Sequence, residues 1–314
     1  MRTCAGRLSD CVIHPVQQPA ARLRVDRHRP AHRCCAADGA LVIERNPITD
    51  DPVLIVPERE QRPNIFREGT DRCPFCAGHE ADTPPEIWRD GDPWRIRVFP
   101  NKYPATERHE VIVETPDHHA TFDQLAPDHA AAVIDSYISR YYSLQSEYVC
   151  IFKNHGPSAG ASIPHLHSQV IGTPFLPRRI EREAAALAHR CALCAIDDEP
   201  LIKATENYRW IAPRGSSMGY EQWIVPRRHE PEMREGLELA ALLQRATHAM
   251  MSVADSFNWI FINFPRQPAA HWYVQLMPRL AVVAGFEIGS GSAINTVLPA
   301  EAARRLQTFR TGPP

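Results

Sequence analysis

The chain has 314 residues, of which 44% are hydrophobic and 23% are charged, and its formal net charge is −2. This length and hydrophobic content suffice for one large core or two modest ones. A charge so close to zero argues against binding nucleic acid through bulk positive charge and against a strongly acidic partner. No apolar run approaches the ~20 residues that cross a bilayer, so no membrane-spanning segment is expected.

Residues 1–38 are rich in arginine, poor in acidic residues, and lack the apolar stretch of a secretory signal. We interpret them as a disordered tail, with a transit-like segment and an over-extended start as the alternatives. The nine cysteines are an odd number in a chain without an export signal, so a disulfide framework is not expected. These features predict a cytoplasmic protein whose folded part begins near residue 39.

Two Cys-x-x-Cys pairs stand out, Cys73 with Cys76 and Cys191 with Cys194. In a cytosolic chain this spacing indicates metal or redox chemistry before it indicates a structural pair of thiols. The CPFC sequence lacks the βαβ surroundings of a thioredoxin-like motif, so metal binding is the favoured interpretation. A single zinc ribbon would close over a much shorter gap than the one between the two pairs. Each pair is therefore expected to find its own partners.

The same order of elements follows each cysteine pair: short apolar strands, a helix, and a last strand that carries histidine. Apolar residues at helical spacing predict the two helices within 123–145 and 232–255. The matched order predicts an internal duplication of an α+β unit, with two antiparallel-sheet halves and packed helices, at residues 39–176 and 177–314. Coincidence is the competing explanation, but the matched cysteine and histidine spacings argue against it.

Each half is expected to add two histidines to its cysteine pair, because zinc prefers four ligands drawn from cysteine and histidine. In the first half His119 competes with His118 for the third position, and His109 and His155 are weaker candidates. Both sets would be closed and therefore structural rather than catalytic. The predicted ligands are Cys73, Cys76, His118 and His165 in the first half and Cys191, Cys194, His229 and His271 in the second.

The sequence HLHSQ at 165–169 follows a loop of glycine, serine, alanine and proline. Alternate residues of a strand share one face, so His167 and Gln169 are expected to point with His165. The small loop residues and Ser162 allow N–H and hydroxyl donors to approach an anion closely, which indicates a bound phosphate. His167 could act as a general base, or attack phosphorus and form a covalent phospho-imidazole. Gln169 would donate to a non-bridging phosphate oxygen.

The aligned run in the second half, at 271–275, differs at one position that matters. It keeps the first histidine, His271, and the glutamine, Gln275, but Tyr273 replaces the second histidine. The duplication is therefore expected to carry one catalytic centre rather than two.

From roughly Val42 to Leu306 the chain resembles the galactose-1-phosphate uridylyltransferase family, the transferase branch of the histidine-triad superfamily. The resemblance rests on several motifs in order: RNPITDDPVLIVPEREQRP, CPFC, VFPNKYPA, TPDH and the His-x-His-x-Gln strand after the loop that starts at Asn154. The later HWYVQLMPRLAVVAGFEIGSGSAIN is similar to the ADP-glucose phosphorylase group and to prokaryotic uridylyltransferases. This resemblance implies a duplicated histidine-triad-like fold with a catalytic N-terminal copy and a non-catalytic C-terminal copy.

The resemblance also implies an activity. His167 would attack the α-phosphorus of a nucleoside-diphosphate sugar, and a hexose 1-phosphate would then accept the nucleotide. The leading form of this activity is a UDP-glucose–hexose-1-phosphate uridylyltransferase of galactose metabolism. Ser162 and Gln169 would hold the transferring phosphoryl group, and zinc would occupy the first ligand set. The ADP-glucose phosphorylase group has a second zinc, at the positions of the second set. The implied substrate-binding residues are Arg59, Arg62, Asn101, Asn154 and Glu287.

The partners implied are a nucleotide sugar and a sugar 1-phosphate, with no nucleic acid and no membrane. Members of the family often form dimers, so the resemblance is compatible with a homodimer. Three departures concern specificity: Leu166 replaces a proline, Lys102 replaces an aspartate that contacts the nucleoside, and no counterpart of a sugar-contacting glutamine lies near Ala293. The reaction type therefore carries over better than the base or the sugar.

Three other functions compete with the leading one. The first is an ADP-glucose phosphorylase-type adenylyltransferase that uses phosphate as the acceptor, which the second cysteine pair and the FEIGSG sequence favour. The second, from another class, is a non-catalytic, zinc-containing nucleotide-binding module, against which the retention of His167 and Gln169 argues. The third is an ordinary histidine-triad hydrolase, which is disfavoured because Gln169 replaces that branch's third histidine.

Overall fold

The computed structural model describes residues 42–64, 66, 72–234 and 236–309. The predicted disordered tail, residues 1–38, lies outside the described residues. In the part of the chain that is described, no helix combines the length and the apolar character needed to cross a bilayer.

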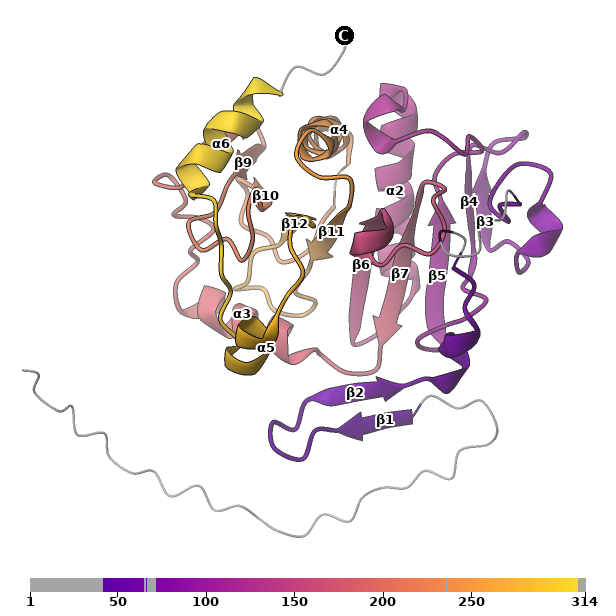
Figure 1. The fold of residues 1–314 in the computed structure, drawn as a ribbon, viewed down its shortest axis with the longest axis horizontal. Helices are drawn as coiled ribbons and strands as arrows, with labels where there is room; N and C mark the ends of the chain where they lie inside the picture. The colour runs from indigo at the N-terminus through magenta and orange to yellow at the C-terminus, as the bar shows by residue number, and fades with distance from the viewer. Residues whose placement is uncertain (1–41, 65, 67–71, 235, 310–314) are drawn as a thin grey trace, which may run out of the picture. The chain divides into compact units, whose positions relative to one another are not determined.

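A ten-stranded sheet in which every neighbouring pair is antiparallel forms the centre of the molecule (Figure 1). In order across the sheet the strands are β3 (Trp88–Asp90), β4 (Ile96–Pro100), β5 (Arg108–Val113), β7 (His167–Thr173), β6 (Tyr148–His155), β11 (Phe257–Ile262), β12 (Tyr273–Pro278), β10 (Gln222–Pro226), β9 (Tyr208–Ile211) and β8 (Leu201–Ala204).

The strand order shows the duplication directly. The two halves meet where β6 pairs with β11, with Asn258 opposite Asn154. Outward from this junction, β7, β5, β4 and β3 on one side correspond to β12, β10, β9 and β8 on the other (Figure 1). The predicted α+β class with two duplicated antiparallel halves is thus confirmed, and the halves share one continuous sheet. The division at 176–177 stays a proposal, and it falls just before the helix α3 (Arg178–His189).

Helices α2 (Pro127–Ser143) and α4 (Leu237–Met251) pack on one face of the sheet and on each other. Both lie inside the ranges that the apolar spacing predicts. Val133 and Ile134 of α2 are fully buried against sheet residues such as Ile112 and Trp259. Proline at the first position of α2 suits a helix start, because that N–H has no partner within the helix.

The opposite face is covered differently in the two halves. In the second half, α3 buries Ile180, Ala184 and Leu187 against sheet residues that include Val225 and Tyr273. In the first half a smaller apolar cluster, which includes Phe75, Phe99 and Val111, lies on this face. The first half thereby leaves room for a pocket.

Short elements complete the described part of the chain. They are a two-stranded sheet of β1 (Val42–Arg45) and β2 (Pro52–Ile55), the 3-10 helices η1 (Pro57–Gln61), η2 (Glu80–Asp82), η3 (Phe122–Gln124) and η4 (Pro157–Ala159), and the helices α5 (Gly285–Ser290) and α6 (Pro299–Thr308).

Candidate active site and metal centres

A pocket of about 450 Å³ lies over β4, β5 and β7 in the first half. That volume is typical of small-molecule sites. Its lining combines apolar walls with donors and cations, and includes Arg62, Pro74, Phe75, Thr83, Phe99, Asn101, Lys102, Tyr103, Ser162, His167 and Gln169.

His167 is the first residue of β7, and its ring lies in the pocket wall. Its Nδ1–H donates to the backbone carbonyl of His165 at 2.7 Å. Burial lowers the pKa of His167 to about 3, and the nearby cations Lys153 and Arg62 contribute to the shift. A neutral imidazole whose Nδ1 carries the hydrogen presents a bare Nε2 lone pair. His167 therefore has the form that a nucleophile or a general base requires.

The loop between β6 and β7 is held close to the second half. Gly156 has a φ of +79°, and a Cβ there would lie 2.3 Å from the hydroxyl oxygen of Ser256, so only glycine fits. Asn258 of β11 donates from Nδ2 to the side-chain oxygen of Asn154 at 2.7 Å and to the carbonyl of Ala159 at 3.0 Å. The second half thus fixes the loop that precedes His167.

Ser162 receives two hydrogen bonds from one arginine. Arg62 donates to its hydroxyl oxygen from Nε at 3.0 Å and from Nη2 at 2.7 Å. With these lone pairs occupied, the hydroxyl hydrogen of Ser162 is left to be donated elsewhere, and Ser162 lines the pocket. Arg62 and Ser162 together supply donors for an anion beside His167.

A buried charged pair lies on the other side of β7. Lys153 Nζ is 2.6 Å from both carboxylate oxygens of Glu114, and it also donates to the carbonyl of His167 at 3.2 Å. Tyr137 of α2 donates to Glu114 and contacts the hydroxyl of Ser168 at 2.6 Å. Burial lowers the pKa of Lys153, while Glu114 opposes that shift. The backbone of the HLHSQ strand is therefore anchored to β5, β6 and α2.

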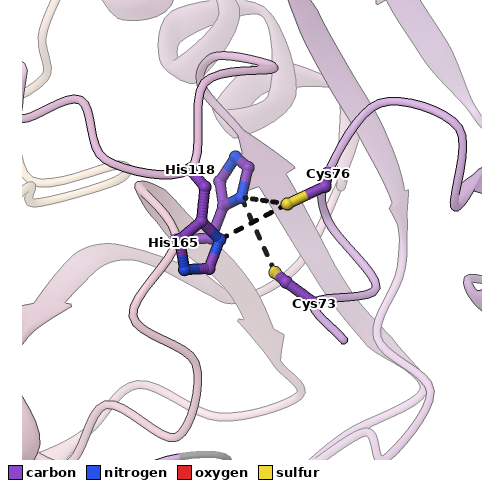
Figure 2. A group of neighbouring side chains, drawn as sticks. All are labelled: Cys73, Cys76, His118 and His165. Carbon is purple, nitrogen blue, oxygen red and sulfur yellow. Dashed lines mark hydrogen bonds between the residues drawn. The ribbon is translucent and has the colours of Figure 1, made fainter. Parts of the chain in front are cut away.

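The predicted ligands of the first half converge on one point (Figure 2). Cys76 Sγ lies 3.3 Å from His118 Nδ1 and 3.7 Å from His165 Nδ1, and Cys73 Sγ lies 3.6 Å from the same His165 nitrogen. Tetrahedral zinc bonds imply sulfur–nitrogen separations of roughly 3.6 Å. His165 Nε2–H donates to the carbonyl of Thr115 at 2.7 Å, which leaves Nδ1 free to bind metal. The donor set fits zinc.

The second set repeats this arrangement. Cys194 Sγ lies 3.2 Å from His229 Nδ1, and both Cys191 and Cys194 lie 3.5 Å from His271 Nδ1. His271 Nε2–H donates to the carbonyl of Pro226 at 2.9 Å, as His165 does to Thr115. Cys194 is exposed, whereas Cys73 is buried. The second set is therefore the more accessible of the two.

In the second half, side chains of α3 fill the position that corresponds to the pocket. Arg179 Nη2 donates to the hydroxyl oxygen of Tyr273 at 3.3 Å and to Gln275 Oε1 at 2.7 Å. Tyr273 in turn donates to Glu183 at 3.1 Å. At the position of the second histidine, this half therefore has a tyrosine whose hydroxyl is already bonded to Arg179 and Glu183.

The other predicted binding residues lie in different places. Asn101 lines the pocket, and Arg59 donates to the carbonyl of Tyr103, which also lines it. Asn154 supports the loop through Asn258 and is not part of the lining. Glu287 is in α5, where its carboxylate accepts from the N–H of Ala284 at 3.2 Å, outside this pocket.

Two residues of the site are not indicated by the sequence pattern. Phe75 stands between the two cysteines of CPFC, and its ring lies 5.2 Å from that of His167. His109, a weak candidate for the first metal set by sequence, instead contacts Gln169. The sequence signal for Phe75 was its place inside the metal motif. The pairing of β5 with β7 brings His109 to Gln169, and no sequence feature of either strand indicates this pairing.

Comparison with known proteins adds independent information. A family profile described as "Domain of unknown function (DUF4931) N-terminal domain" matches residues 57–176. An ADP-glucose phosphorylase of Arabidopsis thaliana is 27% identical over 319 residues, covering 83% of this chain and 91% of that protein. A galactose-1-phosphate uridylyltransferase of Thermotoga maritima is 26% identical over 314 residues, covering 83% and 96%. The chain is thus similar to these two kinds of enzyme over most of its length.

The structural comparison agrees with this relationship. The crystal structure of an ADP-glucose phosphorylase from Arabidopsis thaliana with bound ADP-glucose matches with a TM-score of 0.71 at 28% identity, covering 85% of this chain and 99% of that one. The resemblance to the galactose-1-phosphate uridylyltransferase family is therefore confirmed, and the homologues are of the nucleotidyltransferase type.

Proposed function

We propose that the chain transfers a nucleoside monophosphate from a nucleoside-diphosphate sugar to a phosphate-bearing acceptor through a covalent intermediate on His167. The observation that carries this proposal is the hydrogen bond from His167 Nδ1 to the carbonyl of His165. It leaves Nε2 as the reactive atom, in a pocket that also holds Arg62, Ser162 and Gln169.

In the first step, His167 Nε2 forms a bond to the α-phosphorus of the donor. The bond between that phosphorus and the oxygen bridging to the β-phosphate breaks, and its electron pair leaves with the sugar 1-phosphate. In the second step a phosphate oxygen of the acceptor attacks the same phosphorus, and the phosphorus–nitrogen bond breaks. The imidazole returns to its neutral form, and a new nucleoside-diphosphate compound leaves.

The neighbouring residues stabilise negative charge on the transferring group. The Ser162 hydroxyl, oriented by Arg62, and the Gln169 amide are donors on the same side of the sheet as His167. Fixed donors in a site that excludes water are worth more than the same donors in water, because they need no reorganisation. Arg59, Asn101 and Asn154 would contact or support the nucleotide. The sugar contact of Glu287 rests on the sequence resemblance alone, because its side chain lies outside this pocket.

Zinc would bind the first set, Cys73, Cys76, His118 and His165, and the second set, Cys191, Cys194, His229 and His271. Its contribution there is structural, because four protein ligands leave no open coordination position. In the first half, bound zinc would hold His165 in place, and the carbonyl of His165 orients His167.

Two donors are consistent with this mechanism. UDP-glucose, with a hexose 1-phosphate as the acceptor, is the leading choice and matches the uridylyltransferase relatives. ADP-glucose, with inorganic phosphate as the acceptor, is the second. It is supported by the match to a structure with bound ADP-glucose and by the second set of cysteine and histidine residues. The cytoplasm would be the location of either reaction, and a homodimer the proposed assembly.

The deciding experiment is intact-protein mass spectrometry after mixing with UDP-glucose or ADP-glucose, in separate tubes and without an acceptor. An increase by one UMP or one AMP would support the mechanism and identify the base, provided that His167→Ala gives no adduct. The nucleotide-bearing protein is then mixed with galactose 1-phosphate or with inorganic phosphate. The compound that removes the added mass is the acceptor. An intact fold with no adduct from either donor would contradict this proposal and favour the binding-module alternative.

A further inference from the structure

His109 is a buried residue of β5 that belongs to neither predicted ligand set. Its ring lies on the pocket side of the sheet, as do Val111 and Val113 of the same strand, which pair with Gln169 and His167. His109 Nε2 is 3.0 Å from Gln169 Oε1. It is thus the polar side chain that contacts the glutamine of the HLHSQ strand from the neighbouring strand.

The backbone determines which ring nitrogen of His109 carries the hydrogen. The N–H of Ala105 points at His109 Nδ1 at 2.9 Å. A backbone amide can only donate, so Nδ1 must be the bare nitrogen, and a neutral ring then carries its hydrogen on Nε2. Burial lowers the pKa of His109 to about 4, which keeps the ring neutral near pH 7.

This tautomer in turn determines which way the Gln169 amide points. His109 Nε2–H is a donor, so the atom of Gln169 that faces it must be the carbonyl oxygen Oε1. Asn101 Nδ2 lies 3.1 Å from His109 Nε2 and 3.5 Å from the same Gln169 oxygen, while Asn101 Oδ1 accepts from the N–H of Tyr103 at 2.8 Å. With the hydrogen of His109 on Nε2, both of these nitrogens are donors, and the Gln169 oxygen is the acceptor between them. Within the described residues no acceptor is bonded to Gln169 Nε2, and Gln169 lines the pocket.

The second half provides a comparison with the opposite chemistry. Gln169 pairs with Val111 in β5, and Gln275 pairs with Trp223 in β10. Two residues before these partners stand His109 and Glu221, respectively. Glu221 can only accept, and Gln275 Nε2 donates to it at 2.6 Å, while Gln275 Oε1 accepts from Arg179 at 2.7 Å. A donor and an acceptor at equivalent positions therefore orient the two glutamines in opposite senses.

We propose that His109 is a positioning residue that holds the Gln169 amide with its NH₂ group toward the transferring phosphoryl group. This inference rests on the proposed function of the pocket. The two ends of an amide have opposite polarity, so a reversed Gln169 would direct its oxygen at the phosphate oxygens. The stabilisation of developing charge would then become repulsion.

The test compares two variants of nearly equal size, His109→Gln and His109→Glu. Glutamine can still donate to Gln169 Oε1, whereas glutamate reproduces the acceptor found at position 221. Nucleotidyl-enzyme formation is measured in single turnovers with the donor that labels the wild type, together with the donor Kd. We expect His109→Glu to slow adduct formation by about 10- to 100-fold with a much smaller change in Kd, and His109→Gln to stay close to wild type.

A Gln169→Ala background distinguishes positioning from general support of the fold. In that background the two His109 variants should form the adduct at the same rate, because the amide that they orient is absent. Equal rates of the two variants in the presence of Gln169 would overturn the proposal. An equally large loss for His109→Glu in the Gln169→Ala background would also overturn it. Metal content and the midpoint of thermal unfolding identify a variant that is simply misfolded.

A second readout is independent of catalysis. In ¹⁵N-histidine-labelled wild-type protein, the resonances that disappear in His109→Gln belong to His109. A protonated Nε2 with a bare Nδ1 supports the proposal, and a protonated Nδ1 overturns it. If the wild type forms no adduct with either donor, the proposed function has failed. The spectrum still shows which ring nitrogen of His109 carries the hydrogen.

Discussion

At the scale of single residues, the site depends on which atoms are already bonded. Ser162 shows this clearly, because Arg62 occupies its oxygen with two donors and leaves its hydrogen to be donated. The same reasoning applies to His167, whose Nδ1 is bonded to the carbonyl of His165. In both cases one side of the polar group is hydrogen-bonded within the protein, and the other side is left for a ligand in the pocket.

Ser162→Ala should therefore slow nucleotidyl-enzyme formation by at least about tenfold, because a donor aimed at developing charge is lost. Single-turnover mass spectrometry with the labelling donor measures this rate. Ser158→Ala is the matched control, since Ser158 lies in the same loop but is exposed. An unchanged rate in Ser162→Ala would remove Ser162 from the proposed site.

The members of the candidate site were more predictable from sequence than the contacts that support them. His167, Gln169 and the four ligands in each half could be named because residue type and spacing carry their chemistry. His109 and Lys153 could not, because their roles depend on strand register, which brings residues far apart in sequence into contact. An isolated lysine or histidine in a strand gives no indication of its partner.

At the scale of elements, Lys153 of β6 and Glu114, which follows β5, form a buried pair. Lys153→Met should lower the free energy of unfolding by about 3–5 kcal/mol, because it leaves the carboxylate of Glu114 buried without a partner. Urea unfolding followed by circular dichroism measures the change. The double variant Lys153→Met with Glu114→Gln should recover much of the loss. If the double variant were no more stable than Lys153→Met, the pairing would not explain the cost.

The two metal sets allow a comparison of elements with the same chemistry in different surroundings. Cys73→Ser and Cys191→Ser should each lower the bound zinc by one ion per chain and reduce stability. Cys73→Ser should also slow adduct formation, because the first set includes His165, whose carbonyl orients His167. Cys191→Ser should leave that rate nearly unchanged. Elemental analysis measures the bound zinc, and single-turnover experiments measure the rate of adduct formation. An equal loss of rate in both variants would contradict the expected difference.

At the scale of the whole molecule, the second half takes part in building the candidate site of the first. Asn258 of β11 bonds Asn154 and the carbonyl of Ala159, so the loop before His167 is held from across the β6–β11 junction. The sequence predicted two halves but not that they would share one sheet. The residues of β6 and β11 do not indicate from sequence alone that these two strands pair.

Asn258→Ala should slow adduct formation several-fold, because the loop loses two hydrogen bonds that are worth about 1 kcal/mol each. Asn207→Ala is a suitable control, since Asn207 is an exposed residue of the same half that bonds Glu238. Equal rates in the two variants would show that the loop holds its shape without help from β11.

The filling of the second copy by Arg179, Glu183 and Tyr273 has a practical consequence. Two related units in one chain would ordinarily leave the number of working centres open to question. Here one unit offers an imidazole in a pocket and the other offers a phenol that is already bonded. A radioactive donor should therefore add at most one nucleotide per polypeptide. The radioactivity bound per mole of protein would then give the fraction of active molecules in any preparation. A ratio approaching two would mean that the plugged copy can open.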